Sequence, residues 1–155
     1  MQLFRNNIKS LLIVLMLAIT LQVDALPRAV NYSFTHIGTN EGLSSSYIKA
    51  ITKDSNGFMW FGTKNGLNRY DGKTVKNYSC YDYVNNRGNN NISSLYATPD
   101  GGLWVGTDRG VYIYDPRNDT FTHLATKTSD GISADDWVQD IIPDKRGNIW
   151  VLIPN

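Results

Sequence analysis

Two stretches of the sequence decide the fold: GFMWFGTKNGLNRYDG at residues 57–72 and GGLWVGTDRGVYIYDP at residues 101–116. They align without a gap on Trp60 and Trp104, and a weaker third copy surrounds Trp150. The three tryptophans are 44 and 46 residues apart. A period in the mid-forties with one tryptophan per unit is typical of the four-stranded blade of a β-propeller. The repeat therefore predicts an all-β chain built from consecutive blades, with each tryptophan ring filling space beside its sheet.

Turn signals divide each of the first two units into four strand-like runs. The predicted strands are residues 47–52, 58–62, 67–70 and 74–78 in the first unit, and 92–97, 103–106, 111–114 and 121–124 in the second. Asn65-Gly66 and Asp71-Gly72 mark tight turns, because these residue types tolerate positive φ. Beyond the apolar run near the N-terminus, no segment repeats with a helical period. The third copy departs from the pattern, since Leu152-Ile153 replaces the expected Gly-Thr.

The order of the runs predicts the domain organisation. Phe34-Thr35-His36 resembles Phe121-Thr122-His123, the outermost strand of the second unit. We therefore interpret the mature chain as beginning with an orphan strand that closes the last blade of a ring, which removes an exposed sheet edge. The predicted partial propeller covers residues 33–155 after a lead-in at 26–32. Its parts are the closing strand at 33–38, a first blade at 46–79, a second at 91–125 and an incomplete third at 137–155.

The N-terminus predicts export. Arg5 and Lys9 precede a short apolar run at residues 11–21, and Val23 and Ala25 supply small residues for cleavage after Ala25. This is the pattern of a secretory signal peptide at residues 1–25, and the run is short for a membrane span. The single cysteine, Cys80, allows no intrachain disulfide, which suits a bacterial envelope protein. We therefore expect a periplasmic location, with membrane contact through the signal peptide or a helix further along the protein.

Net charge and ligand-forming residues narrow the function classes. A formal net charge of +1 lacks the basic stripe that nucleic-acid binding requires, so no nucleic-acid partner is expected through this segment. One cysteine and two histidines offer no metal-ligand spacing, and no cofactor is predicted. The two histidines, His36 and His123, occupy matching strand positions, which does not favour a phosphoacceptor role.

The repeats resemble a known family. The resemblance covers about residues 33–151 and is carried by Gly42-Leu43-Ser44, by Gly57 to Gly62-Thr63, by Asn65-Gly66-Leu67, and by the matching residues of the second unit. The chain resembles the two-component regulator propeller repeat family. The resemblance implies the periplasmic sensor region of a hybrid two-component system of the Bacteroides type, recognising an oligosaccharide. It also implies further blades, an inner-membrane anchor, a downstream histidine kinase and a dimeric receptor.

Ligand contacts are expected where loops differ between blades, at one end of the central channel. The loops that differ most are residues 85–91 and 125–136. Their polar and aromatic residues, with Trp137 just beyond the second loop, could hydrogen-bond sugar hydroxyls or stack on a pyranose ring. The candidate ligand-binding residues are Arg87, Asn89, Asn90, Lys127, Asp136 and Trp137. The alternative is that both loops are solvated connections.

Two other functions stay open from the sequence. One is an interaction scaffold, and the other is a propeller glycoside hydrolase or lyase. Glycoside hydrolysis needs two carboxylates facing each other about 5 to 9.5 Å apart. The aspartates here, such as Asp54, Asp71 and Asp115, fall mostly in predicted turns, so the sequence does not favour an enzyme. A group of lysines in the first blade, including Lys49 and Lys64, is interpreted as a solvated rim or as a site for an acidic sugar.

Overall fold

The computed structural model describes residues 31–82, 87–124 and 136–154. The chain divides at residue 35, and every strand of the described residues lies within residues 36–155. The predicted signal peptide at 1–25 and most of the lead-in at 26–32 lie outside the described residues. Within the described part of the chain, no helix has the length and apolar character needed to cross a membrane. The only helical element described there is a 3-10 turn, η2 (Thr39–Glu41), so the all-β prediction is confirmed.

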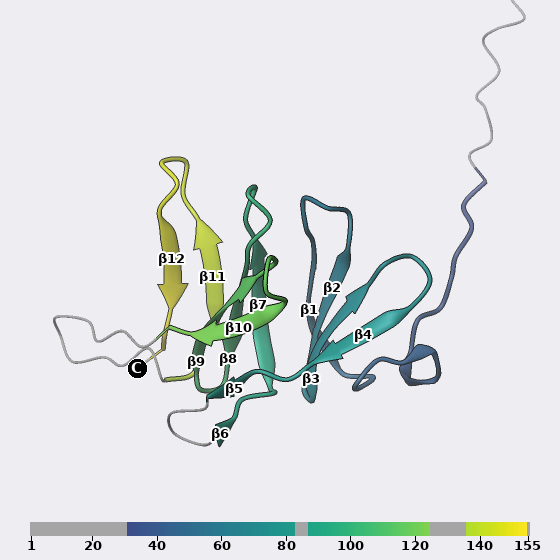
Figure 1. The fold of residues 1–155 in the computed structure, drawn as a ribbon, viewed down its shortest axis with the longest axis horizontal. Helices are drawn as coiled ribbons and strands as arrows, with labels where there is room; N and C mark the ends of the chain where they lie inside the picture. Colours follow the sequence, from purple (N-terminus) through teal and green to yellow (C-terminus); the bar gives the residue numbers. More distant parts are fainter. Residues whose placement is uncertain (1–30, 83–86, 125–135, 155) are drawn as a thin grey trace, which may run out of the picture. The chain divides into compact units, whose positions relative to one another are not determined.

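Two four-stranded antiparallel sheets form the predicted blades (Figure 1). Blade 1 has the order β1-β2-β3-β4 and blade 2 has the order β7-β8-β9-β10. Their strands agree with the predicted ones to within one residue at each end. The bounds are β1 (Ile48–Lys53), β2 (Met59–Thr63), β3 (Gly66–Tyr70), β4 (Val75–Tyr78), β7 (Ile92–Ala97), β8 (Leu103–Thr107), β9 (Gly110–Asp115) and β10 (Thr120–His123).

Two hairpins complete the described strands. β11 (Asp140–Pro143) pairs with β12 (Ile149–Leu152) and forms the predicted half of a third blade. β5 (Tyr81–Asp82) pairs with β6 (Arg87–Gly88) in the connection between the blades. This second hairpin was not predicted, because two-residue strands are too short to carry a hydrophobic pattern. Residues 33–38 have no strand partner among the described residues, so their role as a closing strand stays a prediction.

An aspartate six residues before the repeat tryptophan organises the first turn of the blade. Asp54 Oδ1 accepts hydrogen bonds from the amides of Asn56 (2.9 Å) and Phe58 (3.0 Å). Its Oδ2 accepts one from Trp60 Nε1 at 2.8 Å, inside the protein. Asp144 makes the same set of bonds, reaching Trp150 Nε1 at 3.3 Å. One carboxylate therefore fixes both the turn and the orientation of the indole.

At the junctions that follow blade 1 and blade 2, a glycine faces a β-branched residue of the next blade unit. A Cβ added to Gly62 would lie 2.5 Å from Ile92 Cγ2, and one added to Gly106 would lie 2.7 Å from Val138 Cγ1. Ile92 and Val138 are both fully buried. Glycine thus recurs in the second strand of blades 1 and 2 because the neighbouring blade, joined at Gly106 by Ser94 of the same blade, occupies the space of a side chain.

The rings of the repeat tryptophans become more exposed along the chain. Trp60 and Trp104 occupy the same register, opposite Arg69 and Ile113 respectively, as the repeat predicts. Trp60 is fully buried against blade 2, with its ring centroid 5.1 Å from that of Tyr114. Trp104 is half-buried and Trp150 is 65% exposed. Burial of this ring is therefore provided by the following blade.

A charged cluster joins the outer strands of blades 1 and 2. Asp119 Oδ1 accepts hydrogen bonds from the hydroxyls of Tyr114 (2.6 Å) and Tyr78 (2.8 Å), and Oδ2 accepts one from Lys76. Arg69 donates to Tyr114 Oη at 2.9 Å and lies 3.6 Å from the same carboxylate. Hydrogen bonds from Lys76 and then Tyr114 are the main causes that hold the pKa of Asp119 well below its ordinary value. The cluster ties three strands of two blades to one carboxylate.

Candidate ligand-binding face

One face of the blades carries both the segments that enter the innermost strands and the β2–β3 and β8–β9 turns. The amide of Lys64 donates to the carbonyl of Tyr47 at 3.1 Å in blade 1. The amide of Asp108 makes the equivalent bond to Asn91 at 3.2 Å in blade 2. We call the surface formed by residues 47–49, 64–65, 89–93, 108–109 and 136–139 the entry face. Loops from three successive blade units meet there, which is where propeller ligands are expected.

The turns of the entry face are built by the Gly-Thr motif. Thr63 Oγ1 donates to the carbonyl of Gly66 at 2.9 Å and accepts from the amide of Asn65 at 3.1 Å. Thr107 makes the same two bonds, at 2.8 and 3.1 Å. Gly66 and Gly110 adopt φ of 129° and 101°, which only glycine reaches at low cost. Because the threonine hydroxyl fixes the backbone, the two residues between are exposed and free to differ: Lys64 and Asn65 in blade 1, Asp108 and Arg109 in blade 2.

Trp137 is held by blade 2 on both sides of its backbone. The carbonyl of Asp136 accepts from the amide of Gly110 at 3.0 Å, and the amide of Val138 donates to the carbonyl of Thr107 at 2.9 Å. Val138 is fully buried, whereas the Trp137 side chain is 51% exposed and Asp136 is exposed. Both predicted residues therefore lie on the entry face with exposed side chains.

The two predicted asparagines make hydrogen bonds within the protein. Asn89 is buried, and its Nδ2 donates to the hydroxyl of Tyr112 and to the carbonyl of Arg109 at 3.3 Å. Asn90 is half-buried, and its Oδ1 accepts from the amide of Cys80 at 3.1 Å. These bonds shape the loop that enters blade 2. Of the other predicted residues, Arg87 lies in β6 with a side chain outside the described part, and Lys127 lies outside the described residues altogether.

Sequence reasoning missed Tyr47, which is 62% exposed. Tyr47, Asn91 and Trp137 are each 13 residues before the repeat tryptophan of their own unit. They therefore occupy one repeat position, one residue before β1, one before β7 and three before β11. Asn91 Oδ1 accepts from Lys49 Nζ at 2.8 Å, which links blade 2 to blade 1 on this face. Counting back from each tryptophan would have brought these three residues together.

The aspartates of the turns are occupied by local hydrogen bonds. Asp71 Oδ1 accepts from the amides of Thr74 (2.6 Å) and Lys73 (2.7 Å), and Oδ2 accepts from the Thr74 hydroxyl at 2.7 Å. The bonds from Thr74 are the main cause that lowers the pKa of Asp71 to about 2. Turn hydrogen bonds also lower the pKa of Asp115 and Asp144. A carboxyl that serves as a general acid needs a raised pKa, so these aspartates have the opposite tuning.

The cysteine thiol and the arrangement of metal-ligating side chains bear on catalysis by this chain. Burial raises the pKa of Cys80 to about 12, which keeps its thiol protonated and unreactive. Within residues 31–82, 87–124 and 136–154, no three His, Cys, Asp or Glu side chains gather as they would to hold a metal ion.

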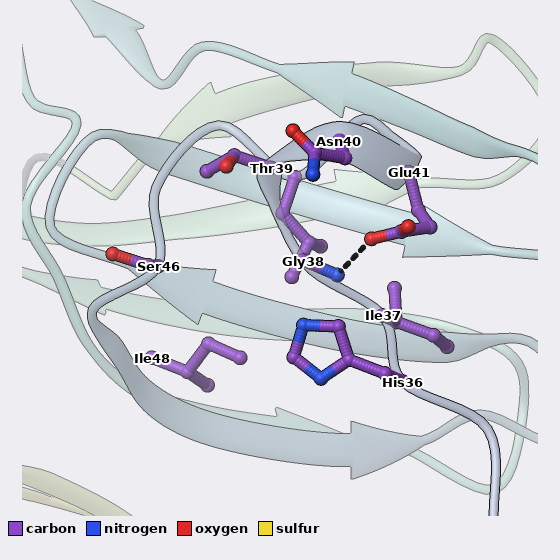
Figure 2. A pocket seen from close by; sticks show the side chains of 9 residues that line it. His36, Ile37, Gly38, Thr39, Asn40, Glu41, Ser46 and Ile48 are labelled. Atoms are coloured by element: carbon purple, nitrogen blue, oxygen red, sulfur yellow. Dashed lines mark hydrogen bonds between the residues drawn. The ribbon is translucent and has the colours of Figure 1, made fainter.

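A pocket of about 230 Å³ lies beside the start of β1 (Figure 2). The η2 turn forms one wall, where the amide of Gly38 donates to Glu41 Oε2 at 2.7 Å. Ile48, at the other side, occupies the repeat position of Ile92, which is buried against the preceding blade. The pocket therefore lies on the side of blade 1 that corresponds to the side of Ile92 packed against the preceding blade. Its lining residues are His36, Ile37, Gly38, Thr39, Asn40, Glu41, Leu43, Ser46 and Ile48.

Known proteins match this chain in sequence. A family model described as two component regulator propeller matches residues 42–65 and 86–109, the beginnings of the two blade units. A segment of 48 residues is 42% identical to histidine kinase P4 of Formosa agariphila, covering 31% of this chain and 4% of that protein. The matched region of this kinase is thus a small part of its length.

Solved structures match the fold. The extracellular domain assigned to a hybrid two-component system of B. thetaiotaomicron aligns with a TM-score of 0.65 and 27% identity, over 78% of this chain and 18% of that chain. A second extracellular domain of the same bacterium aligns with a TM-score of 0.60 and 23% identity, over 80% and 18%, which shows the fold alone. The chain spans less than a fifth of the length of these structures. The model of the two component regulator propeller family thus falls on both blades, and the blades share the fold of these extracellular domains.

Proposed function

We propose that this chain is the first part of a periplasmic sensing propeller, which recognises an oligosaccharide and passes the signal to a kinase elsewhere in the intact protein. The observation that carries the proposal is the match, at 27% identity, to the extracellular domain of a hybrid two-component system. The similarity of one segment to a histidine kinase supports the same role. In this proposal the intact protein also contains the remaining blades, an inner-membrane anchor and a dimer interface.

The entry face is the proposed recognition surface. The blades supply a rigid frame, whereas the residues that differ between blades, such as Trp137 and Asp136, project from it. Arg87 and Lys127 complete the proposed site, and Asn89 and Asn90 shape its backbone through their own hydrogen bonds. To signal, the ligand must bind one state of the receptor more tightly than the other, since equal affinity for both shifts nothing.

Calorimetry on the complete exported region tests the proposal. The titrants are oligosaccharides released from xylan, arabinan, pectin and chondroitin sulfate, each followed by chromatography for cleavage products. We expect saturable binding of at least one of them without cleavage. Failure of every oligosaccharide to bind would contradict the sensing role, and cleavage of the bound one would replace it with the hydrolase or lyase alternative.

A further inference from the structure

The exposed large apolar side chains described within residues 36–155 divide into two classes. The first class occupies repeat positions that are buried in another blade. Ile48 is 36% exposed, whereas its equivalent Ile92 is fully buried. Trp150 is 65% exposed, whereas Trp60 is fully buried. Ile51 and Ile142 likewise lie at positions whose equivalents are buried or half-buried. Leu152 replaces the glycine that faces the next blade in blades 1 and 2, so it also lies on a side that packs against a blade.

The second class is Tyr47 and Trp137, which are 62% and 51% exposed. Their equivalent in blade 2 is Asn91, a polar residue that bonds to Lys49. Packing between blades therefore does not require an apolar residue at this repeat position. Two of its three copies nonetheless present an aromatic ring to solvent, on the face where the ligand is proposed to bind.

Both rings project from fixed backbone. The carbonyl of Tyr47 is bonded to the amide of Lys64, and Trp137 lies between two backbone hydrogen bonds to blade 2. A ring on a fixed backbone loses little conformational entropy when a ligand covers it, so it is well suited to recognition.

Polar groups lie on the same face between the two rings. Asn91 and Lys49 are joined at 2.8 Å, and Asp108 and Arg109 are exposed in the adjacent turn. Within the described part of the chain, neither Lys49 nor Arg109 takes part in an ion pair. Amide, ammonium and guanidinium groups are the donors and acceptors that sugar hydroxyls require.

We infer that Tyr47 and Trp137 are two stacking platforms of one extended site for a linear oligosaccharide, with Asn91 and Lys49 hydrogen-bonding the sugar units between them. This inference rests on the proposed function. It adds that the ligand is extended and names the residues that contact it. The apolar face of a pyranose ring packs on each aromatic ring, while its hydroxyls face the polar groups. Tyr47 and Trp137 precede β1 and β11, and β7 contacts both of these strands and lies between them (Figure 1). A ligand that covers both rings therefore has to extend past the start of β7.

Calorimetry with oligosaccharides of increasing length tests the inference on the complete protein. The probes are size-graded oligosaccharides of xylan, arabinan, pectin and chondroitin sulfate, from one sugar unit upward. We expect affinity to rise with length until both platforms are covered. Tyr47→Ala and Trp137→Ala should each weaken binding of the longest ligand roughly tenfold, while Tyr47→Phe and Trp137→Tyr, which keep a ring, change it less than about threefold.

A matched pair of lysines provides the control for the polar contacts. Lys49 and Lys53 are both exposed at opposite ends of β1, so only Lys49→Ala should weaken binding. Equal affinity for a monosaccharide and a longer oligosaccharide would overturn the inference, as would wild-type affinity in the two alanine variants of the rings. In those cases an oligosaccharide still binds and the proposed function stands. If no oligosaccharide binds at all, both fail.

Discussion

At the residue scale, the repeat tryptophan and glycine of blade 1, Trp60 and Gly62, both pack against blade 2. The Trp60 ring is oriented by Asp54 and covered by blade 2, where it meets Tyr114. Two residues after the tryptophan, Gly62 receives Ile92 of the next blade. The Trp and Gly of the motif therefore pack blade against blade.

Replacing Trp60 with alanine should destabilise the propeller by about 3–5 kcal/mol, because a large fully buried ring is lost and the Asp54 carboxylate loses a partner. Urea unfolding followed by circular dichroism measures the loss. Trp137→Ala is the matched control, since its ring is 51% exposed and its removal should cost less than about 1 kcal/mol. Equal effects of the two substitutions would contradict the assigned packing.

Gly62→Ala should cost about 1–3 kcal/mol, because the new methyl group would lie 2.5 Å from Ile92 Cγ2. Combining it with Ile92→Ala should cost less than the sum of the two single changes, since the clash is removed. Gly88→Ala is the control, because its Cβ would meet nothing closer than 3.8 Å. Simple additivity in the double variant, measured by unfolding, would show that the two residues do not interlock.

At the scale of elements, the turns explain what the sequence could and could not predict. Strand positions followed from Asn-Gly, Asp-Gly and Gly-Thr signals, because these act over a few residues. The β5–β6 hairpin and the hydrogen bond from Asn89 to Tyr112 could not be predicted, since the latter joins residues 23 apart in sequence. The sequence predicts Asn89 as a ligand contact and does not reveal that its Nδ2 donates to the hydroxyl of Tyr112 and to the carbonyl of Arg109. Trp137 lies three residues before β11, and Tyr47 becomes evident as its equivalent only when the units are aligned back from each tryptophan.

The Asp119 cluster predicts a pH dependence for the junction of blades 1 and 2. Its carboxyl has a lowered pKa in the folded protein, so the stabilisation is present above the ordinary aspartate pKa, near 4. It is lost as the pH falls from there towards the lowered value. Because the side chain is 37% exposed, we expect Asp119→Asn to cost only about 1 kcal/mol at pH 7.

Urea unfolding at pH 7 and at pH values below 4 checks this prediction. The difference between wild type and Asp119→Asn should shrink as the pH falls. Lys76→Gln removes the largest cause of the lowered pKa and should flatten the wild-type dependence. A constant difference across the series would mean that the carboxylate does not titrate with folding.

At the scale of the whole molecule, apolar faces of the outer described blades are exposed. Ile48 and Ile51 of blade 1, and Ile142, Trp150 and Leu152 of the third-blade hairpin, are all at least 36% exposed. Blade arrays gain stability from each neighbour that covers such a face. The chain of residues 26–155 produced alone should therefore unfold without a cooperative transition, whereas the intact protein's propeller should unfold cooperatively. Differential scanning calorimetry of both decides this, and a sharp transition in the short chain would contradict it.

The central claim is that this propeller senses an oligosaccharide for a kinase. Its most direct test is phosphate incorporation from labelled ATP by membranes that contain the complete protein, with and without an oligosaccharide that calorimetry shows to bind. The account predicts that incorporation changes on adding this oligosaccharide, and that the change weakens roughly tenfold in apparent affinity in the Trp137→Ala variant. Phosphate incorporation that is absent, or identical with and without the bound oligosaccharide, would contradict it.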